Sequence, residues 1–228
     1  MLRTTRALLL AVPSVVVTGL LLAGCGVLPG QAVAPVDLAT LVPTAENPDP
    51  SVAIDGVEGQ VFQGAQHVGP QVRVAYTFTP PIGGTHDQAW AACNGVVYDR
   101  PVRSENMVHS LEHGAVWIAY DPERVDDAGV AALAARVEGQ QYMLLSPYPG
   151  MDAPVSLQSW GHQLALDDVD DPRIDQFVAA LRVNRYTHPE PGASCEEVGR
   201  GYFSRADPPA FAPTPDASDV DGQAVVAQ

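Results

Sequence analysis

Two histidines and a glutamate lie close together in residues 107–114, which read Met-Val-His-Ser-Leu-Glu-His-Gly. If this segment is helical, His109 and His113 occupy positions i and i+4 on one face, and Glu112 lies beside them. Two imidazoles one helical turn apart can bind the same transition-metal ion, as in many zinc and copper sites. This segment is therefore the first candidate for chemistry in the chain.

A loop upstream supplies a third imidazole. His86 follows the sequence Pro-Pro-Ile-Gly-Gly-Thr, and together with His109 and His113 it would complete a trigonal or tetrahedral site. Glu112 would be a further ligand or would accept a hydrogen bond from an imidazole N–H. We therefore expect a copper or zinc ion to be held by His86, His109, His113 and Glu112.

Two other interpretations of the same residues are open. In the first, the histidines and Glu112 form a structural polar network without an ion, inside a non-catalytic module of the cell envelope that binds a protein or cell-wall partner. In the second, residues 109–113 are the His-x-x-Glu-His motif of a zinc-dependent hydrolase, with Glu112 as general base. That motif needs a continuous helix, whereas Gly114 and the apolar residues 115–120 predict that the helix ends at once. The sequence leaves enzyme activity undecided, leans against it, and assigns no catalytic residue.

The other histidines, and two arginines near the segment, are weaker candidates. His162 lies in a predicted strand, where we expect a hydrogen-bonded or surface residue. His67 and His188 are expected to be solvated at the domain edges. Arg100 and Arg103 flank a Pro-Val pair and are expected in solvent, with anion binding as the alternative.

The elements expected to position these residues form an α+β fold. Apolar patterns predict strands at residues 72–78, 115–120, 142–145 and 155–166, the last bent near Gly161. Apolar stripes with acidic first turns predict helices at residues 126–138 and 171–181. We expect one compact domain with a mixed β-sheet and about two main helices. Its second half is similar in element order to a thioredoxin-like fold, with Pro154 where that fold has a cis proline.

The N-terminus has the pattern of an exported lipoprotein. Arg3 and Arg6 precede an apolar segment, residues 7–23, and a Leu-Ala-Gly-Cys sequence ends at Cys25. This pattern predicts a lipoprotein signal peptide over residues 1–24 and acylation of Cys25. The acyl chains would hold the protein on the extracytoplasmic face of the cell membrane. An uncleaved membrane anchor is the alternative.

Export also bears on the two remaining cysteines. Because the compartment would be oxidising, Cys93 and Cys195 are expected to form a disulfide. The closed loop of about 100 residues would contribute about 4–5 kcal/mol in the chain-entropy model. The alternative is that Cys93 is a thiolate ligand near the histidines.

The charge of the chain excludes some partners. Twelve basic residues, all arginine, and 27 acidic residues give a formal net charge of −15. This balance argues against binding to nucleic acid and against electrostatic binding to anionic lipid. The expected partners are the membrane through lipidated Cys25, a metal ion and an unidentified envelope protein.

Composition divides the exported part into three regions. Residues 25–51 are rich in proline, alanine and small polar residues and are expected to form a flexible tether. Residues 52–202 are expected to form the globular domain, which is long enough for one core. Residues 203–228 have few large apolar residues and several prolines, so we expect a disordered, acidic tail.

Four segments carry a resemblance to a known family. They are residues 80–87 (Pro-Pro-Ile-Gly-Gly-Thr-His-Asp), 93–98 (Cys-Asn-Gly-Val-Val-Tyr), 99–102 (Asp-Arg-Pro-Val) and 108–114 (Val-His-Ser-Leu-Glu-His-Gly). In this order they are similar to the bacterial domain of unknown function 3105. Asn94 and one additional valine depart from the shorter Cys-Gly-x-Tyr form of that family. The resemblance covers residues 55–195 and implies the domain boundaries and the candidate site, without implying an activity.

Overall fold

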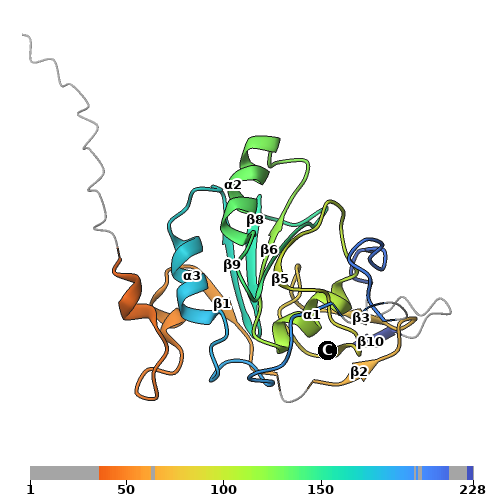
Figure 1. Ribbon diagram of the computed structural model, residues 1–228, viewed down its shortest axis with the longest axis horizontal. Coiled ribbons are helices and arrows are strands. Elements are labelled where there is room, and N and C mark those ends of the chain that lie inside the picture. The colour runs from red at the N-terminus through yellow and green to blue at the C-terminus, as the bar shows by residue number, and fades with distance from the viewer. Residues whose placement is uncertain (1–35, 63–64, 198, 200–201, 216–224, 228) are drawn as a thin grey trace, which may run out of the picture. The chain divides into compact units, whose positions relative to one another are not determined.

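A six-stranded mixed sheet forms the centre of the protein in the computed structural model, which describes residues 36–215 except 63–64, 198 and 200–201, and also residues 225–227 (Figure 1). The strands are β1 (Val57–Gly59), β5 (Asn94–Val97), β6 (Val116–Tyr120), β7 (Met143–Pro147), β8 (Val155–Ser159) and β9 (His162–Leu166). Their order across the sheet is β1-β9-β8-β6-β7-β5. β5 and β6 both run parallel to β7. β8 is antiparallel to β6, β9 to β8, and β1 to β9.

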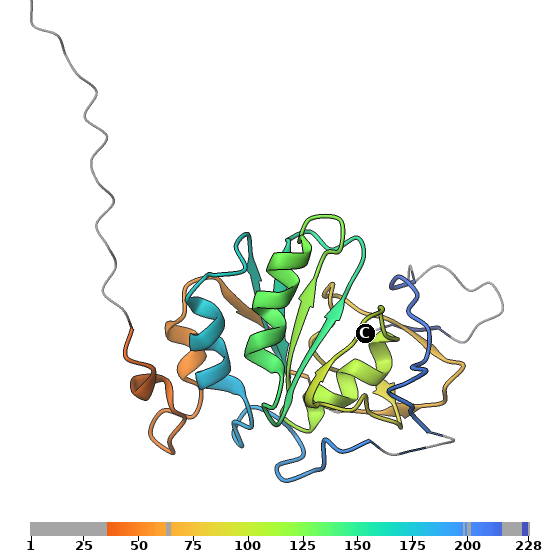
Figure 2. The ribbon, with the colours of Figure 1, turned by 45° about the horizontal axis from the view of Figure 1, so that its top comes forward.

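Helices cover both faces of this sheet. They are α1 (Ser104–Glu112), α2 (Asp127–Val137) and α3 (Arg173–Leu181). α2 and α3 pack on one face and α1 on the other (Figures 1 and 2). Because strand side chains alternate between faces, Val116 and Ile118 of β6 join the core under α2 and α3, while Trp117 joins the core under α1. The structure confirms the expected α+β fold.

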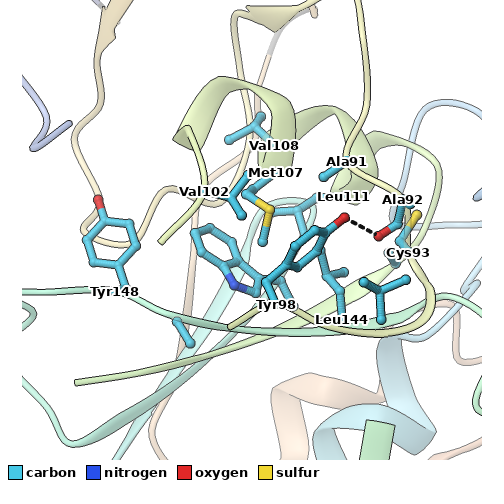
Figure 3. Close-up of a cluster of buried hydrophobic side chains, with 14 of the residues drawn as sticks. Ala91, Ala92, Cys93, Tyr98, Val102, Met107, Val108, Leu111, Leu144 and Tyr148 are labelled. Atoms are coloured by element: carbon cyan, nitrogen blue, oxygen red, sulfur yellow. Dashed lines mark hydrogen bonds between the residues drawn. The ribbon is translucent and has the colours of Figure 1, made fainter. Parts of the chain in front are cut away.

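The core under α1 is built from aromatic, aliphatic and sulfur-containing side chains (Figure 3). Met107 and Leu111 point from α1 into this core and are fully buried. The hydroxyl of Tyr98 donates a hydrogen bond of 2.8 Å to the carbonyl oxygen of Ala92. This contact satisfies the one polar group that Tyr98 brings into the apolar interior.

Several local sequence signals have the expected effect. Asp126 caps α2, since its Oδ1 accepts a hydrogen bond of 2.9 Å from the N–H of Gly129. Gly114 follows α1 with a φ of 92°, and its N–H donates to the oxygen of Leu111. A left-handed glycine at this position ends a helix. The bend expected near Gly161 is the turn between β8 and β9, where Gly161 has a φ of 74°.

Other elements differ from the expectation. The strand expected at residues 72–78 is reduced to β3 (Arg73–Ala75), which pairs in parallel with β10 (Val225–Ala227). The N–H of Val74, in the middle of β3, donates to the Glu105 carboxylate at 2.8 Å, which ties this strand to α1. The edge strand β1 and the short strands β2 (His67–Val68) and β4 (His86–Asp87) were also not expected. The cis peptide bond of the described residues precedes Pro80 rather than Pro154, and the comparison with thioredoxin stays a prediction.

Chain outside the expected globular region also packs on it. Two 3₁₀ helices, η1 (Leu38–Leu41) and η2 (Pro50–Ala53), contact α3, and Leu41 is buried there. η1 and the first two residues of η2 lie in the stretch expected as a tether, whereas Val52 and Ala53 belong to the expected globular region. In the stretch expected as a disordered tail, Phe203 is buried and the carbonyl of Pro209 accepts a hydrogen bond of 3.0 Å from the N–H of Arg103. Single buried aromatic and aliphatic residues hold these segments in spite of their proline-rich composition.

The structure confirms the disulfide between Cys93 and Cys195, whose Cα atoms are 4.8 Å apart. Cys93 is therefore not a thiolate ligand. The expected signal peptide and Cys25 lie outside the described residues. Within the described part of the chain, no helix has the length and apolar character that crossing a membrane requires.

Candidate metal centre

Short elements from distant parts of the chain bring four candidate ligands together. Because β2 and β4 pair in parallel, His67 and His86 are direct register partners. β4 also packs on α1, which carries His109 and Glu112 one turn apart. One ligand atom from each of the four residues lies within 4.8 Å of the others. We call this set, His67, His86, His109 and Glu112, the inner group.

The Glu112 carboxylate is the common point of the inner group. Its Oε2 lies 2.8 Å from Nε2 of His86, 3.6 Å from Nε2 of His67 and 3.8 Å from Nε2 of His109. The side chain of Glu112 is only 5% exposed, whereas that of His67 is 49% exposed. Three imidazole nitrogens thus face one buried oxygen, with His67 on the solvent side.

Main-chain carbonyl groups orient the buried imidazoles. The hydrogen bonds run from Nδ1 of His86 to O of Gly84 (2.7 Å), from Nδ1 of His109 to O of Asp87 (2.7 Å) and from Nδ1 of His113 to O of Ser194 (2.6 Å). A carbonyl oxygen only accepts, so each Nδ1 carries the hydrogen. Each Nε2 of a neutral ring is then left with a free lone pair, which is the state in which histidine binds a metal.

No hydrogen bond accounts for the close contact between His86 and Glu112. Nε2 of His86 and Oε2 of Glu112 are both buried, and neither has a hydrogen-bond partner. With the hydrogen of His86 on Nδ1, both facing atoms are acceptors, 2.8 Å apart. Two buried acceptors at this distance repel each other unless a cation or a proton lies between them.

Electrostatics keeps these groups in the forms that bind metal. Burial, together with the neighbouring His86 and His113, lowers the pKa of His109 to about 3. Burial also lowers the pKa of His113. Burial alone would raise the pKa of Glu112, but its contact with His86 and the charges of nearby imidazoles bring this pKa below its ordinary value. At neutral pH, His109 and His113 are therefore neutral and Glu112 is ionised.

His113 belongs to a second set of ligand atoms. Its Nε2 lies 3.4 Å from Oε2 of Glu190. Ligand atoms of His109, His113 and Glu190 lie within 4.8 Å of one another, and we call these three residues the outer group. The four expected ligands are thus divided: His86, His109 and Glu112 meet in the inner group, while His113 meets His109 in the outer group.

Two residues of these groups were not expected, and one neighbouring histidine was misplaced. His67 was expected to be solvated, and its ring is half exposed, but its Nε2 faces Glu112. No sequence signal marks a two-residue parallel strand pair, so His67 could not be found. Glu190 was not considered because it lies far along the chain. His188 was also expected in solvent, which is wrong: it is buried, and its Nδ1 donates to the carbonyl of Glu112 at 3.0 Å.

Arg103 was expected in solvent, and this expectation is also wrong. Its side chain is 11% exposed and forms ion pairs with Asp87 and Glu105. These contacts fix Asp87, whose main-chain oxygen orients His109. Arg103 therefore supports the site through a buried charge network. Arg100, in contrast, is half exposed and pairs with Asp99.

Aromatic rings form walls around the two groups. The Trp90 ring centroid lies 4.8 Å from that of His113 and 5.5 Å from that of His109. The Trp160 ring meets His86 edge-on at 5.9 Å. Such walls lower the local polarity and strengthen electrostatic interactions within the site. His162 lies outside both groups, where its Nε2 bonds to the carboxylate of Asp49 at 3.1 Å.

The fold and the site together define an α+β domain with a partly buried cluster of histidines and glutamates, in which His67 and Glu190 reach the surface. A family model described as "Protein of unknown function (DUF3105)" matches residues 67–197, more than half of the chain. The chain belongs to this family. The matched range begins at His67 and includes every residue of the inner and outer groups. No curated protein and no solved structure matches the chain.

Proposed function

We propose that this protein is a lipid-anchored, extracytoplasmic domain that binds one transition-metal ion, zinc or copper, through the inner group. The observation that carries the proposal is the pair of buried acceptors, His86 Nε2 and Glu112 Oε2, 2.8 Å apart without hydrogen-bond partners. A cation between them removes the repulsion and satisfies both atoms.

A metal ion explains more of the arrangement than a proton does. A proton on Nε2 of His86 would satisfy that one contact and make the cluster a structural network. It would leave the lone pair of His109 Nε2 directed at the same carboxylate, 3.8 Å away. The half-exposed His67 also has its Nε2 within 3.6 Å of this oxygen. One ion can bind all four atoms, which favours metal binding over the structural network.

The donor atoms indicate which metal fits. Three imidazole nitrogens and a carboxylate oxygen suit Zn²⁺ or Cu²⁺, whereas Cu⁺ prefers sulfur. Neither nearby sulfur is a donor, because Cys93 is in a disulfide and Met107 is buried in the core under α1. The proposed ion is therefore Zn²⁺ or Cu²⁺.

The same contacts favour binding over hydrolysis. In a zinc hydrolase, the glutamate of the motif must be free to take a proton from a water molecule. Glu112 instead lies in direct contact with His86 and is nearly inaccessible. We therefore place Glu112 among the ligands and assign it no role as a base.

Anchoring to the membrane is the second part of the proposal, and the Leu-Ala-Gly-Cys sequence that ends at Cys25 supports it. Fractionation of cells that express the full chain tests it. The wild-type protein is expected in the membrane fraction. After detergent phase separation of that fraction, it is expected in the detergent phase. A Cys25→Ser variant should lose the acyl chains. Acylation at Cys25 would be refuted if the two proteins partitioned alike and mass spectrometry found no acyl chains on the wild type.

Elemental analysis tests metal binding. The full chain is purified without a histidine tag and compared with a His86→Ala/Glu112→Gln variant and with His162→Ala, a control that removes a histidine outside both groups. We expect about one zinc or copper ion per chain in the wild type and the control after dialysis, and none that survives dialysis in the double variant. Circular dichroism checks that all three proteins fold. Absence of metal from the wild type, even after incubation with Zn²⁺ and Cu²⁺, would refute the proposal.

A further inference from the structure

His109 belongs to the inner and the outer group at once, and it has a single atom to offer. Its Nδ1 donates to the carbonyl of Asp87 at 2.7 Å, so only Nε2 is free. A neutral imidazole nitrogen has one lone pair and binds one metal ion at a time. An ion held with His109 in the outer group therefore excludes an ion held with His109 in the inner group.

The two groups differ in the ligand that they expose to solvent. Each has one half-exposed side chain: that of Glu190 in the outer group is 47% exposed and that of His67 in the inner group is 49% exposed. The exposed ligand of the outer group is thus a carboxylate, which attracts a cation, whereas the inner carboxylate of Glu112 is only 5% exposed. The inner group has four ligands and the outer group three. An arriving cation therefore meets the accessible carboxylate at the outer group, while the inner group offers it more bonds.

The main chain holds the outer group against α1. The N–H of Glu190 and Nδ1 of His188 both donate to the carbonyl oxygen of Glu112, at 3.2 and 3.0 Å. The carbonyl of Ser194 orients His113, and the next residue, Cys195, is fixed by the disulfide. The outer ligands are therefore in place before an ion arrives.

We propose that the outer group receives the metal ion from solution or from a donor protein and passes it to the inner group through His109. This inference rests on the proposed function and adds a route to it. During the transfer, the bonds from the metal to His113 and Glu190 break. Bonds to His67, His86 and Glu112 form, while the bond to His109 is kept. No electron is exchanged, and no proton leaves the buried imidazoles, because each already carries its hydrogen on Nδ1.

The transfer is tested by measuring how fast the metal-free full chain takes up Zn²⁺. Stopped-flow fluorescence records this uptake, with a zinc indicator that competes for the ion. We expect the variants Glu190→Gln and His113→Ala to load about tenfold or more slowly than the wild type, because they lack a carboxylate or an imidazole that captures the ion. Their equilibrium Kd should change by less than about threefold, since the inner ligands are intact. Glu196→Gln removes an exposed carboxylate from the same segment and should load at the wild-type rate.

Stoichiometry gives an independent test of the shared ligand. The wild type should bind one Zn²⁺ per chain. The His86→Ala/Glu112→Gln variant should retain one weakly bound Zn²⁺, and adding Glu190→Gln to it should abolish that binding. Two ions bound to the wild type would overturn the inference, because His109 would then not be the limiting ligand.

The kinetic outcomes separate this inference from the proposed function. If Glu190→Gln loads at the wild-type rate while His67→Ala loads slowly, the ion reaches the inner group past the half-exposed His67, and the transfer route is wrong although metal binding stands. If the wild type binds no Zn²⁺ or Cu²⁺, the proposed function fails first. Slow loading of Glu190→Gln with unchanged Kd supports the route.

Discussion

Acid should destabilise the metal-free protein through His109, and the variant His109→Asn should reveal this. Burial lowers the pKa of His109 in the folded protein to about 3 from an ordinary value of 6.5. Between these two values the unfolded chain binds the proton and the folded protein does not. The free energy of unfolding therefore falls as the pH decreases through this range. The contribution of neutral His109 to the free energy of unfolding is complete above pH 6.5 and is lost progressively as the pH falls below this value.

The size of the effect follows from the difference between the two pKa values. Each pH unit in this range corresponds to about 1.4 kcal/mol, so His109 should destabilise the folded protein by about 2 kcal/mol at pH 5 and by about 4 kcal/mol at pH 3. Asparagine keeps an N–H donor near the position of Nδ1, where it can still donate to the carbonyl of Asp87. Asparagine does not take up a proton in this range. The free energy of unfolding of the variant should therefore fall by about 2 kcal/mol less than that of the wild type between pH 8 and pH 5.

Urea unfolding in the presence of a chelator measures this difference. The free energy of unfolding is determined at several pH values from 8 to 5 for the wild type and His109→Asn, and equal m-values show that the two transitions are comparable. The buried His113 and His188 also have lowered pKa values, and they act in both proteins. If the two free energies fall in parallel with pH, His109 is not held neutral by burial and the reasoning is wrong.

Three further substitutions test the framework of the site, with urea unfolding as the common measurement. Cys93→Ala/Cys195→Ala opens a link between residues 102 positions apart and should cost about 4–5 kcal/mol in the chain-entropy model; a loss under about 1 kcal/mol would contradict that model here. Gly114→Ala places a side chain at a φ of 92° and a Cβ 2.7 Å from Nε2 of His188. It should lower the free energy of unfolding by about 2 kcal/mol or more. Unchanged stability would mean that the segment of His188 moves freely. Arg103→Met leaves two buried carboxylates without their partner and should cost about 3–5 kcal/mol, and a neutral result would show that these carboxylates reach water.

The parts of the fold that the sequence predicted depend on local patterns. α2 and α3 have apolar stripes and acidic first turns, and Asp126 is a capping residue that a sequence displays directly. β6 is a continuous apolar run that is buried on both faces. The disulfide followed from the number of cysteines and the expected compartment. None of these features requires knowledge of the tertiary contacts.

α1 was harder to predict because it is buried on every side. All nine of its residues are buried, including polar ones, so no apolar stripe marks its length. Its polar side chains find partners in other segments of the chain. Glu105 accepts from the N–H of Val74 in β3, Asn106 donates to the carbonyl of Ala89, and Ser110 donates to the carbonyl of Ala91. Only the histidine spacing at its C-terminal end was visible in the sequence.

The candidate site was predicted in part for the same reason. His109 and Glu112 are close in sequence, and helical geometry brings them together. His67 joins them through a two-residue strand pair, and Glu190 through hydrogen bonds to the end of α1. These contacts connect segments far apart in the chain, and no local periodicity encodes them. The site could therefore be located from the sequence, but its full set of ligands could not.

The carbonyl groups that orient the buried imidazoles have a consequence for how this site can change during evolution. The acceptors for His86, His109 and His113 all belong to the main chain, so a replacement at an acceptor position keeps the acceptor wherever the backbone keeps its path. This condition restricts Gly84, whose φ is 90°, and Asp87, which Arg103 holds in place. Mutations around the cluster can accumulate without turning the rings, as long as the path of the backbone is kept. A single ligand can also be exchanged, and the metal preference altered, while the remaining rings keep their direction. The site can therefore tolerate substitutions at neighbouring positions, and its metal ligands can be exchanged one at a time.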